Sequence, residues 1–162
     1  MVATAFAGSP LVLATLTALS LNLVFRIGIR RKVATTIDPQ KVDSQETVNF
    51  IERNGAIWGA RRDVVTRVEF AVQQAIEAVI EHCQPKGPIE LEIGYDEFDI
   101  DVALVYAGIP LDLSGKLPTQ DEILESDDGA RRLAAFLLVQ RSQKAESSAA
   151  NGKAVLRLVF RQ

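Results

Sequence analysis

The chain has 162 residues, enough for one domain and an additional element but too few for two ordinary domains. Its net charge of −3 is unevenly spread: residues 1–25 carry no charged side chain, residues 26–32 carry four basic ones, and residues 33–162 therefore carry about −7. Such an acidic part is poorly suited to nucleic-acid binding, and a single cysteine excludes an intrachain disulfide or a zinc site built from several cysteines.

Residues 10–32 have features that are typical of a transmembrane helix. A Ser-Pro pair precedes an apolar run that ends at Phe25, and the basic cluster follows it. A helix of this length spans roughly 34 Å at about 1.5 Å per residue, enough to cross a bilayer core. Because positive flanks stay in the cytoplasm, we expect an inner-membrane protein whose later residues lie in the cytoplasm. A buried helix or a processed leader remains the alternative.

Small and polar residues recur along this segment at Ala14, Thr15, Ala18 and Asn22. In lipid, such residues face other helices, where hydroxyl and amide groups find partners. We therefore expect the membrane and further transmembrane helices of a bundle as partners. A polar residue tolerated in a single anchor is the alternative.

Residues 33–43 lack periodicity and contain an Asp-Pro pair, so they are predicted to be a linker. A helix is expected next, with Asp43 or Ser44 as its cap and Gly59 as its stop. The only tryptophan, Trp58, ends this helix and is interpreted as core packing, with a docking surface as the alternative.

Residues 67–82 show the strongest helical periodicity in the chain. Apolar side chains recur three and four positions apart, which indicates one buried face. They are Val68, Val72, Ala75, Ile76, Val79 and Ile80. Glutamate and glutamine occupy another face, so a core helix with a solvated acidic side is the simplest interpretation.

Two alternating segments then predict a β-hairpin over residues 89–95 and 98–104, in which Phe98 belongs to the buried face. Carboxylates gather at its turn and on its second strand, including Asp99 and Asp101. Calcium loops need glycine and more oxygen ligands than these residues offer, so a solvated strand face is expected and no metal site. A short capped helix is predicted at Thr119–Glu122, a longer helix from Asp127 and a final strand that ends near Phe160.

The segments AVQQAIEAVIEH and LAAFLLVQRSQKAESSAANGKAVLRLVF resemble the histidine-kinase-like ATPase family, in particular its anti-sigma serine-kinase branch. The resemblance covers about residues 61–160. It implies an α+β fold, a two-layer α/β sandwich of the Bergerat type, here preceded by one transmembrane helix. The expected domains are therefore 1–32 (transmembrane helix with basic flank), 33–43 (linker) and 44–162 (degenerate ATPase-like domain).

The resemblance places the family's nucleotide boxes on seven residues. They are Gln74, Ala78, His82, Tyr106, Gly108, Pro110 and Gly129. His82 and Gly108 match the family. Gln74 replaces the glutamate base and Ala78 replaces the asparagine that holds magnesium. We therefore expect a vestigial nucleotide pocket with no catalytic residue and no bound metal, and binding of ATP with magnesium is disfavoured.

The rest of the family's adenine-reading motif is also altered. Tyr106 stands where the family has an aspartate, and Pro110 replaces the second glycine. Of the phosphate-binding glycine-rich box only Gly129 remains, and the two carboxylates beside it would repel a triphosphate.

The segment LVLATLTALSLNLVFRIGIRRK is similar to the last membrane helix of the nucleobase (xanthine/uracil) permease family, some bacterial members of which carry a cytoplasmic extension. Together, the two resemblances imply a non-catalytic regulatory domain attached to a nucleobase transporter, with a protein partner and no nucleic acid. The alternatives are an ATP-binding serine-kinase-like regulator and a single-pass anchored protein-binding module.

Overall fold

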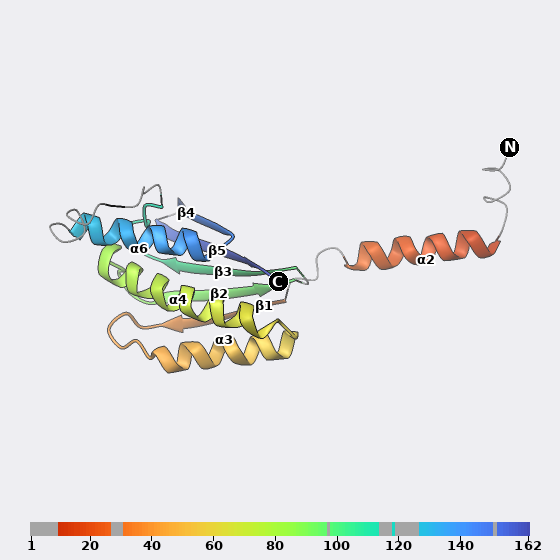
Figure 1. Cartoon of the computed structure of the whole chain (residues 1–162), viewed down its shortest axis with the longest axis horizontal. Coiled ribbons are helices and arrows are strands. Elements are labelled where there is room, and N and C mark those ends of the chain that lie inside the picture. The colour runs from red at the N-terminus through yellow and green to blue at the C-terminus, as the bar shows by residue number, and fades with distance from the viewer. Residues whose placement is uncertain (1–9, 27–30, 97, 114–117, 119–126, 151) are drawn as a thin grey trace. The chain divides into compact units, whose positions relative to one another are not determined.

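The computed structural model describes residues 10–26, 31–96, 98–113, 118, 127–150 and 152–162. The chain divides into two units, Met1–Arg30 and Arg31–Gln162. In the described part of the first unit there is one helix, α2 (Pro10–Arg26). All strands and the other described helices belong to the second unit (Figure 1).

The prediction of a transmembrane helix over residues 10–32 is wrong. Helix α2 has 17 residues, or roughly 26 Å at 1.5 Å per residue, which is shorter than a bilayer core of about 30 Å. Arg31 and Lys32, which were expected to end the helix, instead begin strand β1 (Arg31–Ile37). Within the described ranges, no helix combines the length and apolar character needed to cross a membrane.

The expected inner-membrane location depended on that helix and is corrected with it, as are the membrane, permease and transport assignments. Two threonines of α2 form hydrogen bonds within the helix, and whether the polar stripe faces other helices stays a prediction. The Thr15 hydroxyl donates a hydrogen bond of 2.8 Å to the Leu11 carbonyl, and Thr17 donates likewise to Leu13. Their hydroxyl groups are satisfied within α2 itself.

The second unit is built on a five-stranded sheet in the order β1-β2-β3-β5-β4, in which every neighbouring pair is antiparallel. The remaining strands are β2 (Ile89–Tyr95), β3 (Asp99–Tyr106), β4 (Lys144–Ala150) and β5 (Lys153–Arg161). Strands β1 and β4 are therefore the two edges. The predicted hairpin and final strand are present.

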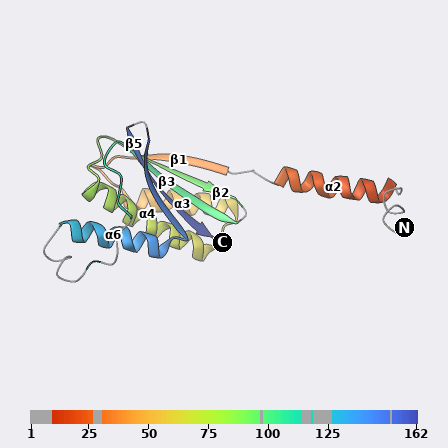
Figure 2. The ribbon, with the colours of Figure 1, turned by 90° about the horizontal axis from the view of Figure 1, so that it is seen from above.

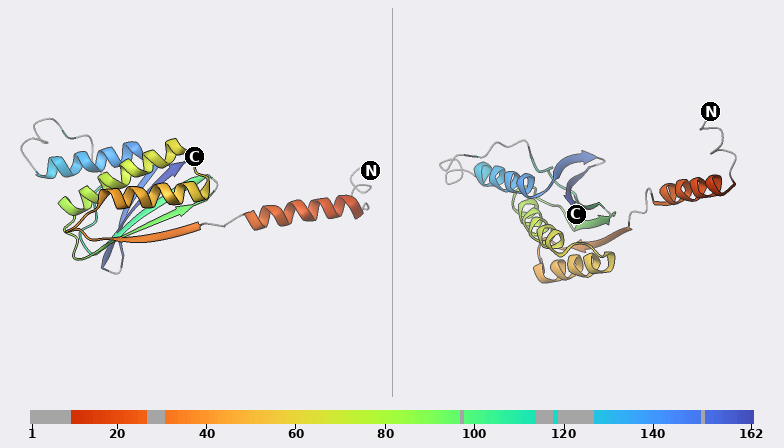
Figure 3. Two further views of the ribbon diagram at one scale, coloured as in Figure 1. Left: turned by 90° about the horizontal axis from the view of Figure 1, so that it is seen from below. Right: turned by 45° about the vertical axis from the view of Figure 1, so that its right-hand side comes forward.

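Three helices cover one face of this sheet: α3 (Ser44–Trp58), α4 (Arg62–His82) and α6 (Asp127–Arg141) (Figures 2 and 3). Asp43 caps α3, since its carboxylate accepts hydrogen bonds from the backbone N–H groups of Gln45 and Glu46. Gly59 ends α3 in the left-handed conformation, φ 71°, which favours glycine. Both predicted caps are confirmed.

The core lies between the helices and the sheet. Helix α4 supplies its centre, as its periodicity predicted, with Val68, Val72, Ala75 and Val79 fully buried. The sheet supplies matching rows across its central strands, since Leu91 pairs with Leu104 and Leu104 with Leu156. The opposite side of these strands is more polar, as is usual when only one face of an antiparallel sheet is covered.

Two local predictions differ from the structure. Residues 33–43 are not simply a linker, because residues 33–37 belong to β1 and pair with β2. Burial alternates along this edge strand, but only Ile37 is fully buried, and the residue types themselves alternate too weakly to indicate a strand. Phe98 was expected in the hairpin core but is 66% exposed in the turn, where the Asp96 carboxylate accepts hydrogen bonds from the N–H groups of Phe98 and Asp99.

The second unit is therefore a mixed α+β fold with a five-stranded antiparallel sheet, as predicted at that level. Trp58 is half-buried and stacks on Tyr95, with ring centroids 5.4 Å apart and planes inclined by 12°. This contact ties the end of α3 to the end of β2 and bears out the packing role expected of the tryptophan.

Candidate functional site

Helix α4 carries three of the seven nucleotide-box positions. Ala78 is buried in the core, where a methyl group offers no ligand to a metal. Gln74 is half-buried, and its Oε1 atom is buried without a hydrogen-bond donor among the described residues. The imidazole Nε2 of His82 lies 3.8 Å from a carboxylate oxygen of Glu81. A carboxamide cannot serve as a base, so α4 lacks the proton acceptor that the resemblance requires at position 74.

Tyr106 occupies the end of β3 and is only 1% exposed. Its hydroxyl donates a hydrogen bond of 3.2 Å to the carbonyl of Ile109. Burial, together with the neighbouring Cys83, raises the pKa of this phenol, which therefore stays neutral. The residue in place of the adenine-reading carboxylate thus has neither a charge nor a free hydroxyl hydrogen to present to a base.

Cys83, directly after α4, lies beside Tyr106 and is 1% exposed. Burial raises the pKa of its thiol, and this effect outweighs the opposing influence of the Tyr106 hydroxyl and of Arg131. A buried neutral thiol is a poor nucleophile. Cys83 therefore acts as a packing residue at this site.

Gly108 lies in the turn that follows β3, against the end of α4. A Cβ atom at this position would approach the Cys83 carbonyl oxygen to 2.5 Å and the Gln84 carbonyl oxygen to 3.3 Å. The turn is also bonded to that segment, since the Ile109 N–H donates to the Cys83 carbonyl at 2.9 Å. Because it has no side chain, Gly108 lets the turn after β3 lie directly against the backbone of Cys83 and Gln84. Pro110 follows and is exposed.

Gly129 is buried in the first turn of α6, which packs against α4. Arg131, in the same part of α6, lowers the pKa of Cys83, although less than burial raises it. The variable region between β3 and α6 falls mostly outside the described residues, and so does the helix predicted at Thr119–Glu122.

The structure thus brings Tyr106, Gly108 and the end of α4 together, and α6 packs against α4. Gln74 lies two turns earlier along α4 than His82, roughly 12 Å away at 1.5 Å per residue. The contacts within this cluster include backbone packing and internal hydrogen bonds, among them those of Ile109 with Tyr106 and Cys83. In the described part of the chain, no three His, Cys, Asp or Glu side chains are grouped closely enough to hold a metal ion.

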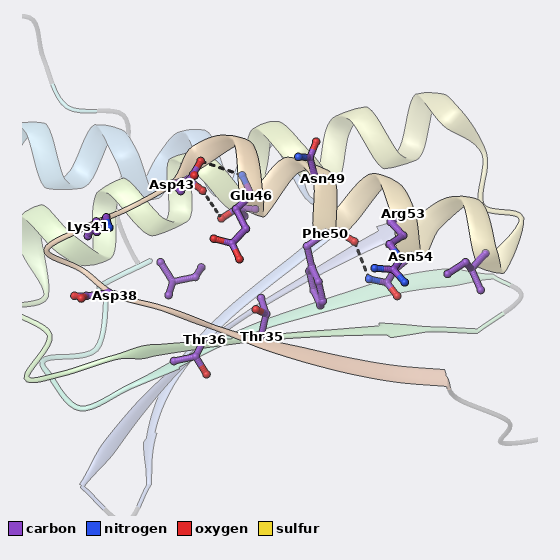
Figure 4. Close-up of a pocket in the computed structure, with 13 residues that line it drawn as sticks. Thr35, Thr36, Asp38, Lys41, Asp43, Glu46, Asn49, Phe50, Arg53 and Asn54 are labelled. Carbon is purple, nitrogen blue, oxygen red and sulfur yellow. Dashed lines mark hydrogen bonds between the residues drawn. The ribbon is translucent and has the colours of Figure 1, made fainter.

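A second candidate site is a groove between edge strand β1 and helix α3, with a volume of about 540 Å³ (Figure 4). Thr35 and Ile37 line its strand side, and Phe50 and Ile57 contribute apolar surface from the helix. The Phe50 ring extends from α3 toward β1 (Figure 4). The groove therefore combines an unpaired strand edge with a partly apolar wall.

The charges along this groove are unevenly distributed. Asp38, Asp43 and Glu46 lie at the end where β1 leaves the sheet and α3 begins, together with Lys41. Arg53 lies farther along α3, next to Asn54 (Figure 4). Neither Glu46 nor Arg53 forms an ion pair with a residue in the described ranges.

Sequence reasoning did not find this groove. Its strand side falls within residues that were interpreted as a linker, and a groove depends on how two elements pack rather than on any local motif. The reversal of charge between Glu46 and Arg53, seven positions apart on one helical face, is the signal that could have indicated it.

Comparison with known proteins found neither a protein family nor a curated protein that matches this sequence.

Proposed function

We propose that residues 31–162 form a non-catalytic protein-interaction domain with the architecture of the histidine-kinase-like ATPases but without their use of nucleotide. The order of elements after α3 supports this proposal. A central helix is followed by two strands, a variable region, a closing helix and two final strands, which is the order that the sequence resemblance implies.

The observation that carries the proposal is the state of Tyr106. At the position expected to read adenine, this residue is buried and its hydroxyl is bonded to the Ile109 carbonyl. Gln74 and Ala78 add to the argument, because a carboxamide cannot act as the base at position 74 and a methyl group cannot bind magnesium at position 78. What remains at this end of the domain is packing.

The proposal is tested by melting the full chain with and without ATP and magnesium. A ligand that binds the folded state at 1 μM would stabilise it by about 4 kcal/mol at about 1 mM, which corresponds to a melting-temperature increase of about 10 °C. We expect a change below about 1 °C, no larger than with magnesium tripolyphosphate, which controls for anion effects. A large increase specific to ATP would instead favour the alternative, an ATP-binding serine-kinase-like regulator.

A further inference from the structure

We propose that the groove between β1 and α3 binds an extended segment of a partner protein, which adds to the sheet as a strand and carries a basic residue, an apolar residue and an acidic residue at alternate positions. This inference rests on the proposed function, because it names the partner chemistry of the interaction domain.

The backbone of β1 supplies the first part of the argument. β1 pairs with β2 on one side only, so its other side presents backbone N–H and C=O groups that a further strand can use. The beginning of β1 carries Arg31 and Lys32, which discourage pairing there. The groove lies along the uncharged half, Thr35–Ile37, where pairing is least opposed.

Helix α3 supplies the second part, because it sets the length and composition of the bound segment. Glu46 and Arg53 are seven residues apart, about 10 Å along a helix axis. Residues i and i+4 of a bound strand are about 13 Å apart and face the same way, so long side chains at these two positions reach Glu46 and Arg53. The residue at i+2 then faces Phe50, between the two charged ends.

The antiparallel pattern of the sheet sets the direction of the bound segment, and charge sets the order of its residues. The end of the groove near Asp38 carries three carboxylates and one lysine, so its net charge is negative, and the end near Arg53 is basic. Antiparallel addition, the pattern of every pair in this sheet, places the N-terminal part of the segment beside Asp38 and Glu46. The expected motif is therefore basic-x-apolar-x-acidic, read from the N-terminus.

The test uses the full chain and two fluorescent, end-capped peptides whose central residues are Lys-Thr-Val-Thr-Glu and, with the charges exchanged, Glu-Thr-Val-Thr-Lys. We expect the first to bind at least about fivefold more tightly, the effect of one exposed charge pair. In the variant carrying Glu46→Lys and Arg53→Glu, the preference should reverse. Lys153→Glu, an exposed charge change on β5, should leave it unaltered.

Peptide chemistry tests strand addition without any change to the protein. N-methylation of the peptide nitrogens whose N–H groups point toward β1 should abolish binding. N-methylation of the intervening nitrogens, whose N–H groups point away from β1, should have little effect. The inference is overturned if neither peptide binds at about 1 mM, or if both bind equally to all variants. It is also overturned if the chain self-associates and the charge-exchanged variant is monomeric, since the groove would then serve a second copy.

These outcomes are separable from those of the proposed function. Absence of peptide binding together with absence of ATP binding removes only the strand-addition inference. ATP binding removes the proposed function whatever the peptides do.

Discussion

Gly108 lies so close to Cys83 that a Cβ atom on the glycine would be 2.5 Å from the cysteine carbonyl oxygen. The same carbonyl accepts a hydrogen bond from the Ile109 N–H. The turn after β3 is therefore packed directly on the end of α4. The glycine that the sequence resemblance assigns to nucleotide approach serves internal packing in this chain.

Gly108→Ala should destabilise the domain by about 1–3 kcal/mol, because the new methyl group meets backbone atoms rather than a flexible side chain. Urea unfolding followed by circular dichroism measures the loss. Gly94→Ala is the matched control, since its nearest contact would be 3.6 Å and the effect should stay within about 0.5 kcal/mol. Equal stability of the two variants would show that the close contact is absent in solution.

Tyr106→Phe should cost about 0.5–1.5 kcal/mol through loss of the hydrogen bond to Ile109. Tyr106→Asp, which installs the residue that the resemblance implies at this position, should cost about 3 kcal/mol or more, because it buries a carboxylate without a partner. It should not confer ATP binding. Tyr95→Phe, on a half-buried tyrosine, provides the control. An aspartate variant that is as stable as the parent would contradict the buried position of residue 106.

The fold could be predicted from the sequence wherever burial of one face gives the apolar residues a regular spacing. The stripe of α4 and the alternation of β2 and β5 are regular because each faces the core along its whole length. β1 was not predicted because its residue types alternate only weakly: burial alternates along the strand, but threonine occupies both an inward and an outward position. The apolar run in α2 suggested a membrane span, but the helix ends at Arg26 and is too short.

Cys83 should react slowly with a thiol reagent such as dithionitrobenzoate while the protein is folded. Its side chain is buried and burial raises the thiol pKa, so both access and thiolate content are low. We expect the rate in native buffer to be at least about 100-fold below the rate in denaturing urea at the same pH. Comparable rates would mean that the end of α4 opens readily.

The stability of the domain should depend on the ionisation of Glu69. Burial raises the pKa of this carboxyl, the nearby Glu52 raises it further, and Arg62 opposes both. A carboxyl whose pKa is raised by folding destabilises the folded state when it is ionised, and this cost disappears as the pH falls below the unfolded value near 4.5.

Glu69→Gln should therefore raise stability slightly at pH 7, by about 0.2–0.5 kcal/mol for this partly solvated group, and should give no gain at about pH 4. Urea unfolding at the two pH values measures the difference. Glu77→Gln, on an exposed residue of the same helix, is the control. A larger gain at low pH than at neutral pH would contradict the assigned direction.

The candidate site was predictable only in part. The resemblance predicts a site without a base at Gln74 and without a metal ligand at Ala78, and this stays a prediction. It did not indicate that Tyr106 is bonded to Ile109, because this local bond depends on the conformation of the turn after β3. Nor did it indicate that Gly108 contacts Cys83, because this contact joins positions 25 apart through tertiary packing. The β1–α3 groove could not be predicted from the sequence, because it depends on how two elements pack against each other.

The most direct measurement is calorimetric titration of the full chain with ATP in the presence of magnesium. We predict no binding heat above that of dilution up to about 1 mM nucleotide, which places any dissociation constant outside the micromolar range. A saturable heat with a micromolar dissociation constant would contradict the account, because it would require a working nucleotide site beside Tyr106 and Gly108.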